Sequence, residues 1–437
     1  MGLMQRITGA LRRRSGIEAA GGGRRWQGAP VLGNPQQSTL AARGLAQQRA
    51  SALSVNTPHG NRIVEAWTAA LVGKGWQARS QHPDPQTRRR LADAFEEMAN
   101  PLLTVMVRAL VRDGESFVQI VTEDDGIRLK PVAADQVDPA LTRDLGNGAR
   151  IVAGIEFDAA DRVTAYHVLP EAPGNPFAIY GAAVRITAAD MIHVFDPLFP
   201  GQVRGLSWLA PVLLKLRDRD EASDALLMQL KTASLITGFI RDPEGGAAGF
   251  DDGAGAGQVN VSLEPGAMRV LPPGADVTFS QPGQGLAQAV EFLRAQDREI
   301  AAGVGLTFES LTGDLGEANY SSARVGLLEF RRRAEMMQKN LIEGQFLRPL
   351  WRRWIDTLSL SGAIPADPAT LADYRAVRFV APGWQWVDPA KEVAAEVAAI
   401  TAGLKSREEV VAGRGRDIDD LDEERARDAV RSKGEAA

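Results

Sequence analysis

Residues 191–212 read MIHVFDPLFPGQVRGLSWLAPV and decide how the chain is divided. The first five residues have the alternating apolar pattern of a short strand. A turn-rich segment follows, and a long helical pattern begins near Ser207. We expect Ser207 to be the N-cap, because its hydroxyl can accept a hydrogen bond from a free N–H of the first turn. Pro211 is tolerated in that turn, where no N–H is needed from it. The segment therefore predicts a boundary between two architectures.

The helix after this boundary is expected to cover residues 206–237 and to stop at Gly238. About 30 helical residues span roughly 45 Å at 1.5 Å per residue. Residues 217–221 are all charged, so the middle of the helix carries charge on nearly every face. This pattern favours a helix that projects into an assembly over a helix buried in a core.

Upstream of the boundary, residues 36–205 mix helical and strand periodicity and predict an α+β module. Apolar residues recur at helical spacing in some segments and alternate with polar residues in others. The expected helices are 38–55, 60–72, 85–98 and 101–112, and the expected strands are 117–121, 127–131, 150–157, 163–169 and 191–195.

Residues 238–284 are rich in glycine and poor in helix formers, and they predict a small β element. Its two strands are expected at 268–271 and 277–281, joined through Pro272-Pro273-Gly274. A second helix is expected over 285–304.

Beyond this helix, Gly313 and Gly316 break the helical pattern within residues 305–320, which are expected to form a loop. A longer helix is expected over 320–360. Pro349 should kink it, because proline lacks an N–H and crowds the preceding turn. Residues 361–437 are expected to be helical.

The composition is that of a folded protein without cysteine chemistry. Of the 437 residues, 44% are hydrophobic and 24% are charged, which is ordinary for globular domains. The lack of cysteine excludes disulfides, cysteine-ligated zinc and cysteine nucleophiles. The net charge of −5 disfavours a protein that coats nucleic acid with a positive surface. It suits a conduit along which DNA slides, and equally an ordinary cytosolic protein. No apolar run reaches the roughly 18 residues of a membrane span, so no membrane partner is expected.

Residues 1–35 are rich in glycine and arginine and predict a flexible basic N-terminus. One interpretation is contact with phosphate or with a neighbouring protein. The other, which composition favours, is a solubilising tail. Arg12, Arg13 and Arg14 directly follow Leu11, so we expect no signal peptide.

No complete catalytic or cofactor motif is present in the sequence, so we expect neither an enzyme, a cofactor nor a metal. The phosphate-binding pattern GxxxxGK[ST] is missing, and the glycines of 253–257 lack the flanking strand and helix of a dinucleotide site. Around Ser207 the second glycine of a hydrolase elbow is missing. His193 and Asp196 are spaced i, i+3, but further metal ligands cannot be placed, and a histidine in a strand is more often structural.

Residues 191–212 resemble the signature of lambda-type tailed-bacteriophage portal proteins. In that family, a strand that ends with histidine and aspartate is followed by the short motifs PGQ, RG, S and LAP, in that order. A long helix comes next. Residues 303–323, GVGLTFESLTGDLGEANYSSA, resemble a second portal stretch, in which LTGD follows a helix end and NYSSAR opens the next helix. A weaker match is WQWVDPAK at 384–391. The resemblance covers about residues 36–430 and departs from the family at 244–257 and in length.

The resemblance implies a portal-like α+β subunit that assembles as a ring. Its parts would be a flexible basic N-terminus (1–35), an α/β wing (36–205), stem helices (206–237 and 285–304), a small β clip (238–284), a tunnel loop (305–320), a kinked wing helix (320–360) and a helical crown (361–437). About twelve copies would surround a channel.

The family also implies the location and the partners. The ring would stand at one capsid vertex of the virion, after assembly in the host cytoplasm, and double-stranded DNA would pass through it without its bases being read. The expected partners are the terminase large subunit, the major capsid or scaffold protein, and the head-completion and tail connector proteins. The residues expected to face the terminase are Phe250, Val261, Met268 and Val277.

The tunnel loop is implied to line the narrowest part of the channel. Its apolar and acidic side chains should not bind phosphate, and its glycines should let it bend as DNA passes. The implied residues are Leu311, Thr312, Gly313, Asp314, Leu315, Gly316 and Glu317.

Five arginines have two interpretations in such a ring, namely Arg294, Arg298, Arg331, Arg332 and Arg333. If they faced the lumen, they would form circles of positive charge that hold phosphate. If they faced a neighbouring subunit, they would pair with acids such as Glu329 or Glu335. We favour the pairing between subunits.

Two other classes of function stay open at the level of the sequence. The chain would form no large ring with an axial channel if it were another phage head-structural or head-completion protein. A nuclease or hydrolase would instead show metal-dependent turnover that is lost on substitution of His193.

Overall fold

The computed structural model describes residues 32–123, 126–174, 181–234, 238–241, 276–279, 286–316, 320–385 and 388–434. The basic segment 1–31, the strand expected at 268–271, and Phe250, Val261, Met268 and Glu317 lie outside the described residues. For Val277 the structure describes the backbone.

Three helices form the first part of the chain: α2 (Pro35–Asn56), α3 (Pro58–Val72) and α4 (Pro85–Asp113). Each begins with proline directly after a capping side chain, from Asn34, Thr57 and Asp84, that accepts a hydrogen bond from an N–H of the first turn. Proline needs no N–H at that position, so the sequence fixes all three starts.

The prediction of two helices at 85–98 and 101–112 is wrong, because α4 continues through Pro101. Proline removes one hydrogen bond and crowds the turn before it. The apolar face of α4 is buried on both sides of this point, at Phe95 and Ala99 before it and at Leu103 and Leu110 after it. Burial along the whole face outweighs the local cost.

A three-stranded antiparallel sheet packs against these helices. The strand order is β3 (Gly126–Val132), β2 (Glu115–Glu123) and β9 (Met191–Phe195). The strand at the start of residues 191–212, which we call the decisive segment, therefore pairs with a strand about 75 residues earlier in the chain. The strand positions expected at 117–121, 127–131 and 191–195 are confirmed.

A second antiparallel sheet has five strands. In order across the sheet they are β4 (Arg143–Gly146), β5 (Ala149–Val152), β6 (Ile155–Phe157), β7 (Val163–Val168) and β8 (Val184–Thr187). The prediction of one strand over 150–157 is wrong, because Ala153 and Gly154 have φ of 47° and 81° and form a two-residue turn. Positive φ at both positions matches the turn that joins twisted antiparallel strands. The 3₁₀ helix η3 (Ala188–Asp190) leads from this sheet into β9.

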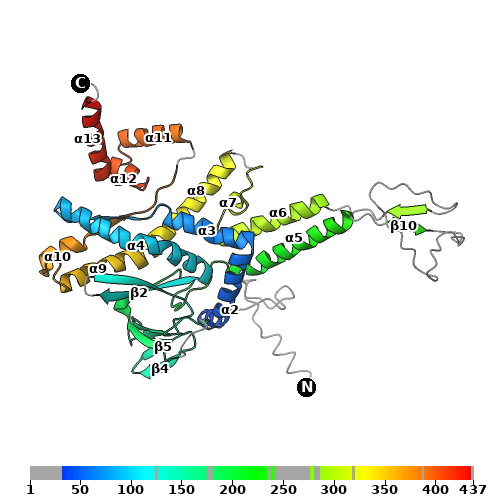
Figure 1. Cartoon of the computed structure of the whole chain (residues 1–437), viewed down its shortest axis with the longest axis horizontal. Coiled ribbons are helices and arrows are strands. Elements are labelled where there is room, and N and C mark those ends of the chain that lie inside the picture. The colour runs from blue at the N-terminus through cyan, green and yellow to red at the C-terminus, as the bar shows by residue number, and fades with distance from the viewer. Residues whose placement is uncertain are drawn as a thin grey trace, which may run out of the picture.

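Two long helices follow the decisive segment: α5 (Leu213–Ser234) and α6 (Leu286–Val304). They lie side by side and project from the rest of the molecule, and β10 (Gly238–Arg241) lies beyond their ends (Figure 1). There β10 pairs with β11 (Asp276–Phe279). The strand expected at 277–281 is therefore present, and its described partner is 238–241.

Ser207 is not the N-cap of α5. The helix starts six residues later, after the 3₁₀ helix η4 (Ala210–Val212), and Ser207 Oγ accepts a hydrogen bond from Leu209 N at 3.2 Å. The chain turns here because Trp208 N donates to Val111 O at 3.1 Å, at the end of α4. This tertiary contact was invisible in the sequence and displaces the helix start.

The expected loop 305–320 contains a short helix, α7 (Phe308–Thr312). Thr307 caps it by accepting a hydrogen bond from Ser310 N at 3.1 Å, and Gly313 ends it in the left-handed conformation. The prediction of a loop throughout is therefore wrong in its first half.

The helix expected over 320–360 consists of α8 (Tyr320–Met337), a π-helical segment η5 (Gln338–Leu347) and α9 (Arg348–Leu360). Pro349 lies in the first turn of α9. The wider π turns before it accommodate its ring and its missing N–H, so the irregularity is a long segment rather than one kink.

The C-terminal part holds α10 (Pro368–Arg375), β12 (Val377–Val380), α11 (Pro389–Thr401), α12 (Arg407–Ala412) and α13 (Ile418–Gly434). The prediction that residues 361–437 are helical is wrong at β12. This strand pairs with β1 (Gln77–Ser80), about 300 residues earlier in the chain.

The main hydrophobic core joins α3, α4, β2, the bases of α5 and α6, and the α8–α9 segment. Trp67, Phe346 and Trp351 are fully buried in it. A smaller core around Phe117 and Tyr166 lies between the two larger sheets. No helix among the described residues is long and apolar enough to cross a membrane.

Candidate functional site

The predicted tunnel-loop residues occupy two different environments. Leu311 is only 3% exposed and belongs to the main core, whereas Leu315 is 69% exposed. The expectation that Leu311 lines a channel is therefore wrong, because α7 turns its side chain inward. Asp314 and Leu315 lie on the part of the loop that reaches solvent.

The loop between α7 and α8 is fixed by local hydrogen bonds. Gly313 has φ of 74°, which lets the chain reverse after α7. Thr312 Oγ1 then accepts from Asp314 N at 3.1 Å, and Asp314 Oδ1 accepts from Gly316 N at 2.9 Å. Leu315 is held outward by this turn.

Two of the three consecutive arginines make contacts within the chain. Arg331 donates to Gln385 O at 2.8 Å and lies over the ring of Trp384. Arg333 lies 5.6 Å from the centre of the Trp67 ring. Burial lowers the pKa of Arg331, against Glu392 and Glu335, which raise it. These two contacts stabilise the subunit. Arg332 and Arg333 are both exposed, and Arg332 is the one without a partner among the described residues.

Arg294 and Arg298 lie on α6 and have acidic partners in the same chain. Arg294 pairs with Asp314 at 3.3 Å, which connects α6 to the loop. Arg298 pairs with Glu291 at 3.4 Å, and its guanidinium lies 5.4 Å from the centre of the Phe308 ring.

The base of the α5–α6 pair is held by a buried carboxylate. Asp297 of α6 accepts from Arg219 of α5 at 2.8 Å and lies 3.3 Å from His59 Nε2 of α3. Burial alone would raise the pKa of Asp297, but the hydrogen bonds from His59 and Arg219 outweigh it and lower the pKa. The charged middle of α5, read from the sequence as a surface feature, thus contributes one buried cross-link.

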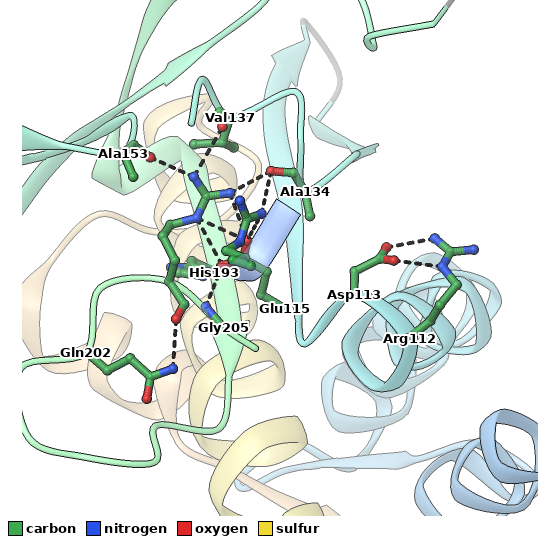
Figure 2. Close-up of polar contacts among 11 residues, drawn as sticks. Arg112, Asp113, Glu115, Ala134, Val137, Ala153, His193, Gln202 and Gly205 are labelled. Carbon is green, nitrogen blue, oxygen red and sulfur yellow. Dashed lines mark hydrogen bonds and ion pairs between the residues drawn. The ribbon is translucent and has the colours of Figure 1, made fainter. Parts of the chain in front are cut away.

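A larger polar cluster surrounds Glu115 at the start of β2, and it includes side chains and backbone of residues 191–212 (Figure 2). Arg204 Nη2 donates to Glu115 Oε1 at 2.8 Å, and Arg43 of α2 donates to the same oxygen. His193 Nε2 lies 3.0 Å from Glu115 Oε2, which also accepts from Gly205 N at 2.8 Å. One carboxylate therefore joins α2, β2, β9 and the 204–205 turn.

Backbone carbonyls accept hydrogen bonds from most of the remaining arginine donors, and Arg43 Nε is buried without a partner among the described residues. Arg204 donates to Ala134 O and Ala153 O, each at 2.6 Å, and Arg43 donates to Ala134 O at 3.1 Å. Arg204 and Glu115 are both 0% exposed. Pairing of nearly all of the hydrogen-bonding groups offsets the cost of burying these charges.

The charges in this cluster cross-link the fold and do not form a catalytic centre. Burial alone would raise the pKa of Glu115, but Arg204 and Arg43 outweigh it and lower the pKa strongly, so the carboxylate stays ionised. Burial lowers the pKa of His193 and thus disfavours the charged imidazolium, despite Glu115, which raises the pKa. Both oxygens of Glu115 are already occupied by protein donors, so the carboxylate has no free position for a substrate.

His193 does not pair with Asp196. Its ring stacks on Phe117 with centroids 4.1 Å apart and contacts Glu115. Within the part of the chain that the structure describes, no group of three or more histidine, aspartate and glutamate residues could hold a metal ion. The interpretation of His193 as a structural histidine is the one the geometry supports.

Steric contact explains why residue 205, in the Arg204-Gly205 pair, is glycine. A Cβ on Gly205 would lie 2.1 Å from Gly114 O, and one on Gly114, which has φ of 88°, would lie 2.1 Å from Leu206 C. The two backbones can approach this closely only without side chains. Residues 204–205 stand out in the sequence as part of the family motif. Arg43 and Glu115 do not, because the local sequence around each gives no sign of its distant partner.

Comparison with known proteins places the chain in a family. The model of the family described as phage portal protein, lambda family, matches residues 22–338. A probable portal protein of Halomonas phage phiHAP-1 is 26% identical over 444 residues, which cover 93% of this chain and 84% of that protein. Portal protein B of Escherichia phage lambda is 22% identical, over 75% of this chain and 68% of that protein.

A solved structure titled as the neck of an empty gene transfer agent particle has a TM-score of 0.46 and 19% identity, over 89% of this chain and 95% of that chain. The family match covers well over half of the 437 residues and includes the decisive segment and the α7–α8 loop. This chain belongs to the lambda family of phage portal proteins.

Proposed function

We propose that this chain is one subunit of a ring at a capsid vertex, and that double-stranded DNA passes through the channel of the ring during packaging and ejection. The observation that carries the proposal is the match of the portal family over residues 22–338. Portal proteins are structural, so the chain acts by binding and positioning rather than by catalysis. Passage of any genome requires contacts that do not read bases.

The parts of the subunit take distinct roles in this proposal. Residues 36–205 form the wing, α5 and α6 form the stem, and residues 238–284 form the clip. Support for the stem comes from the way α5 and α6 project together from the body, with β10 beyond their ends (Figure 1). The clip would then be the part that the terminase large subunit reaches, with head-completion and tail connector proteins replacing the terminase after packaging.

The tunnel loop in this proposal is 313–320, after α7, with Asp314 and Leu315 on its solvent side. The crown is the region from 388 onward. In support of that boundary, Tyr374, Phe379 and Trp384 pack against the main core, whereas no described side chain between 388 and 431 is buried. The wing is the surface on which we expect the major capsid or scaffold protein to bind.

Electron microscopy of the purified chain, with its mass measured in solution, tests the proposal. We expect rings with a central hole and a mass of about twelve times the subunit mass of 46.9 kDa. A closed cyclic assembly has both properties. A chain that stays monomeric or dimeric, even when expressed together with its capsid and scaffold proteins, would contradict it.

A further inference from the structure

A cavity of about 710 Å³ lies between the end of α6 and α8. Leu306, Phe330 and Met336 give it apolar walls, and Glu329 and Arg332 lie at its edge. Leu306 is 7% exposed and Met336 is 50% exposed, so the cavity opens from the core to the surface. An open apolar hollow of this size on a folded subunit marks a surface that binds something.

Two charges at the edge of the cavity have no partner among the residues that the structure describes. Arg332 and Glu329 are exposed, and neither side chain makes an ion pair or hydrogen bond with the described residues. The neighbouring Arg331 and Arg333, in contrast, contact Trp384 and Trp67. Arg333 is also exposed and also lines the cavity, but its guanidinium lies over the Trp67 ring, so Arg332 is the arginine of the triplet without a described partner.

The loop after α7 carries the complementary groups. Leu315 is 69% exposed on a turn fixed by Thr312 and Asp314. The Asp314 side chain is 38% exposed, although it contacts Arg294 at 3.3 Å. The loop thus presents the apolar Leu315 beside the acidic Asp314. The cavity presents apolar walls beside the basic Arg332.

Rotational symmetry restricts which elements of an adjacent copy can meet the cavity. Rotation about the axis of a ring changes neither the height of a residue along the axis nor its distance from the axis. Thr307 lines the cavity, and α7, which starts at the next residue, leads to the loop. Five helical residues rise only about 7.5 Å, so cavity and loop lie at nearly the same level. Symmetry therefore allows the loop of one copy to face the cavity of the next.

We propose that this cavity receives Leu315 from the adjacent copy of the chain, with Arg332 at its edge facing Asp314 of that copy. The contact is heterologous, as a closed ring requires, because the cavity and the loop are different surfaces of one subunit. It would fix the position of each loop by the neighbouring subunit. The inference rests on the proposed ring.

The absence of cysteine from the chain allows a direct test by disulfide cross-linking. In the variant with Leu315→Cys and Met336→Cys, mild oxidation of assembled rings should give a ladder of covalent multimers on a non-reducing denaturing gel. We expect about tenfold more cross-linked product than in a control pair, because a disulfide needs Cβ atoms within about 4.5 Å. The control pair is Leu315→Cys with Val105→Cys, since Val105 is 53% exposed on α4.

Imaging of the same samples separates the possible failures. Rings that give no ladder, or only a disulfide within one chain, would overturn the loop contact and leave the channel function standing. If the unmodified chain formed no rings, the channel function and the contact would both fall.

A second variant tests the charged part of the contact. Arg332→Glu should lower the yield of rings several-fold, whereas Arg352→Glu, at another exposed arginine without a described partner, should not. Equal yields from the two variants would remove Arg332 from the contact.

Discussion

Gly205 and Gly114 lie back to back, so closely that a Cβ on Gly205 would be 2.1 Å from the carbonyl oxygen of Gly114. This contact sets the turn that leads from β9 into α5, and it also aims Gly205 N at Glu115. The orientation of the projecting helix pair therefore depends on two glycines at the end of α4 and in the decisive segment.

Gly205→Ala should destabilise the subunit by several kcal/mol, because the added methyl group meets backbone rather than a flexible side chain. Gly44→Ala is the matched control. Gly44 lies within α2 with nothing within 4 Å of the added Cβ, so that change should stabilise by about 0.5–1 kcal/mol. Urea unfolding of the two variants gives both numbers, and equal effects would contradict the steric account.

Glu115→Gln should cost about 3–5 kcal/mol, because it leaves two buried arginines without their counter-ion. The same substitution at Glu123, on the same strand, is the control. Glu123 pairs with Arg128 at the surface, where an ion pair contributes about 0.2–1 kcal/mol. Chemical denaturation measures the difference, and a loss below 1 kcal/mol at Glu115 would show that the cluster does not lock α2 to the 204–205 turn.

His193 should make stability depend on pH. Its folded pKa is lowered by burial, so below the unfolded value of about 6.5 the unfolded chain binds a proton that the folded chain does not. Stability should therefore fall as pH drops from 6.5 toward the folded pKa, by up to about 1.4 kcal/mol per pH unit. Glu115 acts in a separate window. Its pKa is depressed, so its contribution is complete above its unfolded pKa and is lost only as the pH falls toward its much lower folded value.

His193→Gln keeps an N–H donor for Glu115 but does not titrate. We expect it to flatten the stability profile between pH 6.5 and pH 5, whatever it does to the absolute stability. An unchanged slope in thermal unfolding across that range would exclude His193 as the titrating group.

The C-terminal helices should detach reversibly in high salt. They are held to the body largely by ion pairs, including Arg79 with Asp417 at 3.2 Å and with Asp420 at 2.6 Å. Raising the salt from 0.1 to 1 M shortens the screening length from about 10 to about 3 Å. Hydrogen exchange in residues 407–434 should then accelerate while exchange in α4 stays constant. Arg79→Gln should produce the same change at low salt, and unchanged exchange in both conditions would mean that the docking is not ionic.

The sequence predicted what depends on neighbours along the chain. The helices α3 and α6 were expected nearly at their observed bounds, because their apolar periodicity is local and Thr57 caps the first of them. The positions of strands β2, β3 and β9 were also predictable from alternation.

What the sequence could not supply depends on distant residues. Ser207 has every local property of an N-cap, but its segment is held by Val111 and Gly114, so α5 starts later. The pairing of β12 with β1 joins positions about 300 residues apart. The ion pair of Glu115 with Arg43 joins positions 72 residues apart. Leu311 was misplaced because one turn of helix decides whether a leucine in a glycine-rich loop points inward.

The channel itself is tested most directly by the DNA content of capsids made with and without this chain. Heads assembled from the same phage proteins should contain double-stranded DNA, and a ring at one vertex, only when the chain is present. Their buoyant density and cryo-electron micrographs report both properties. Heads that fill with DNA equally well in its absence would contradict the assignment of this chain as the DNA channel.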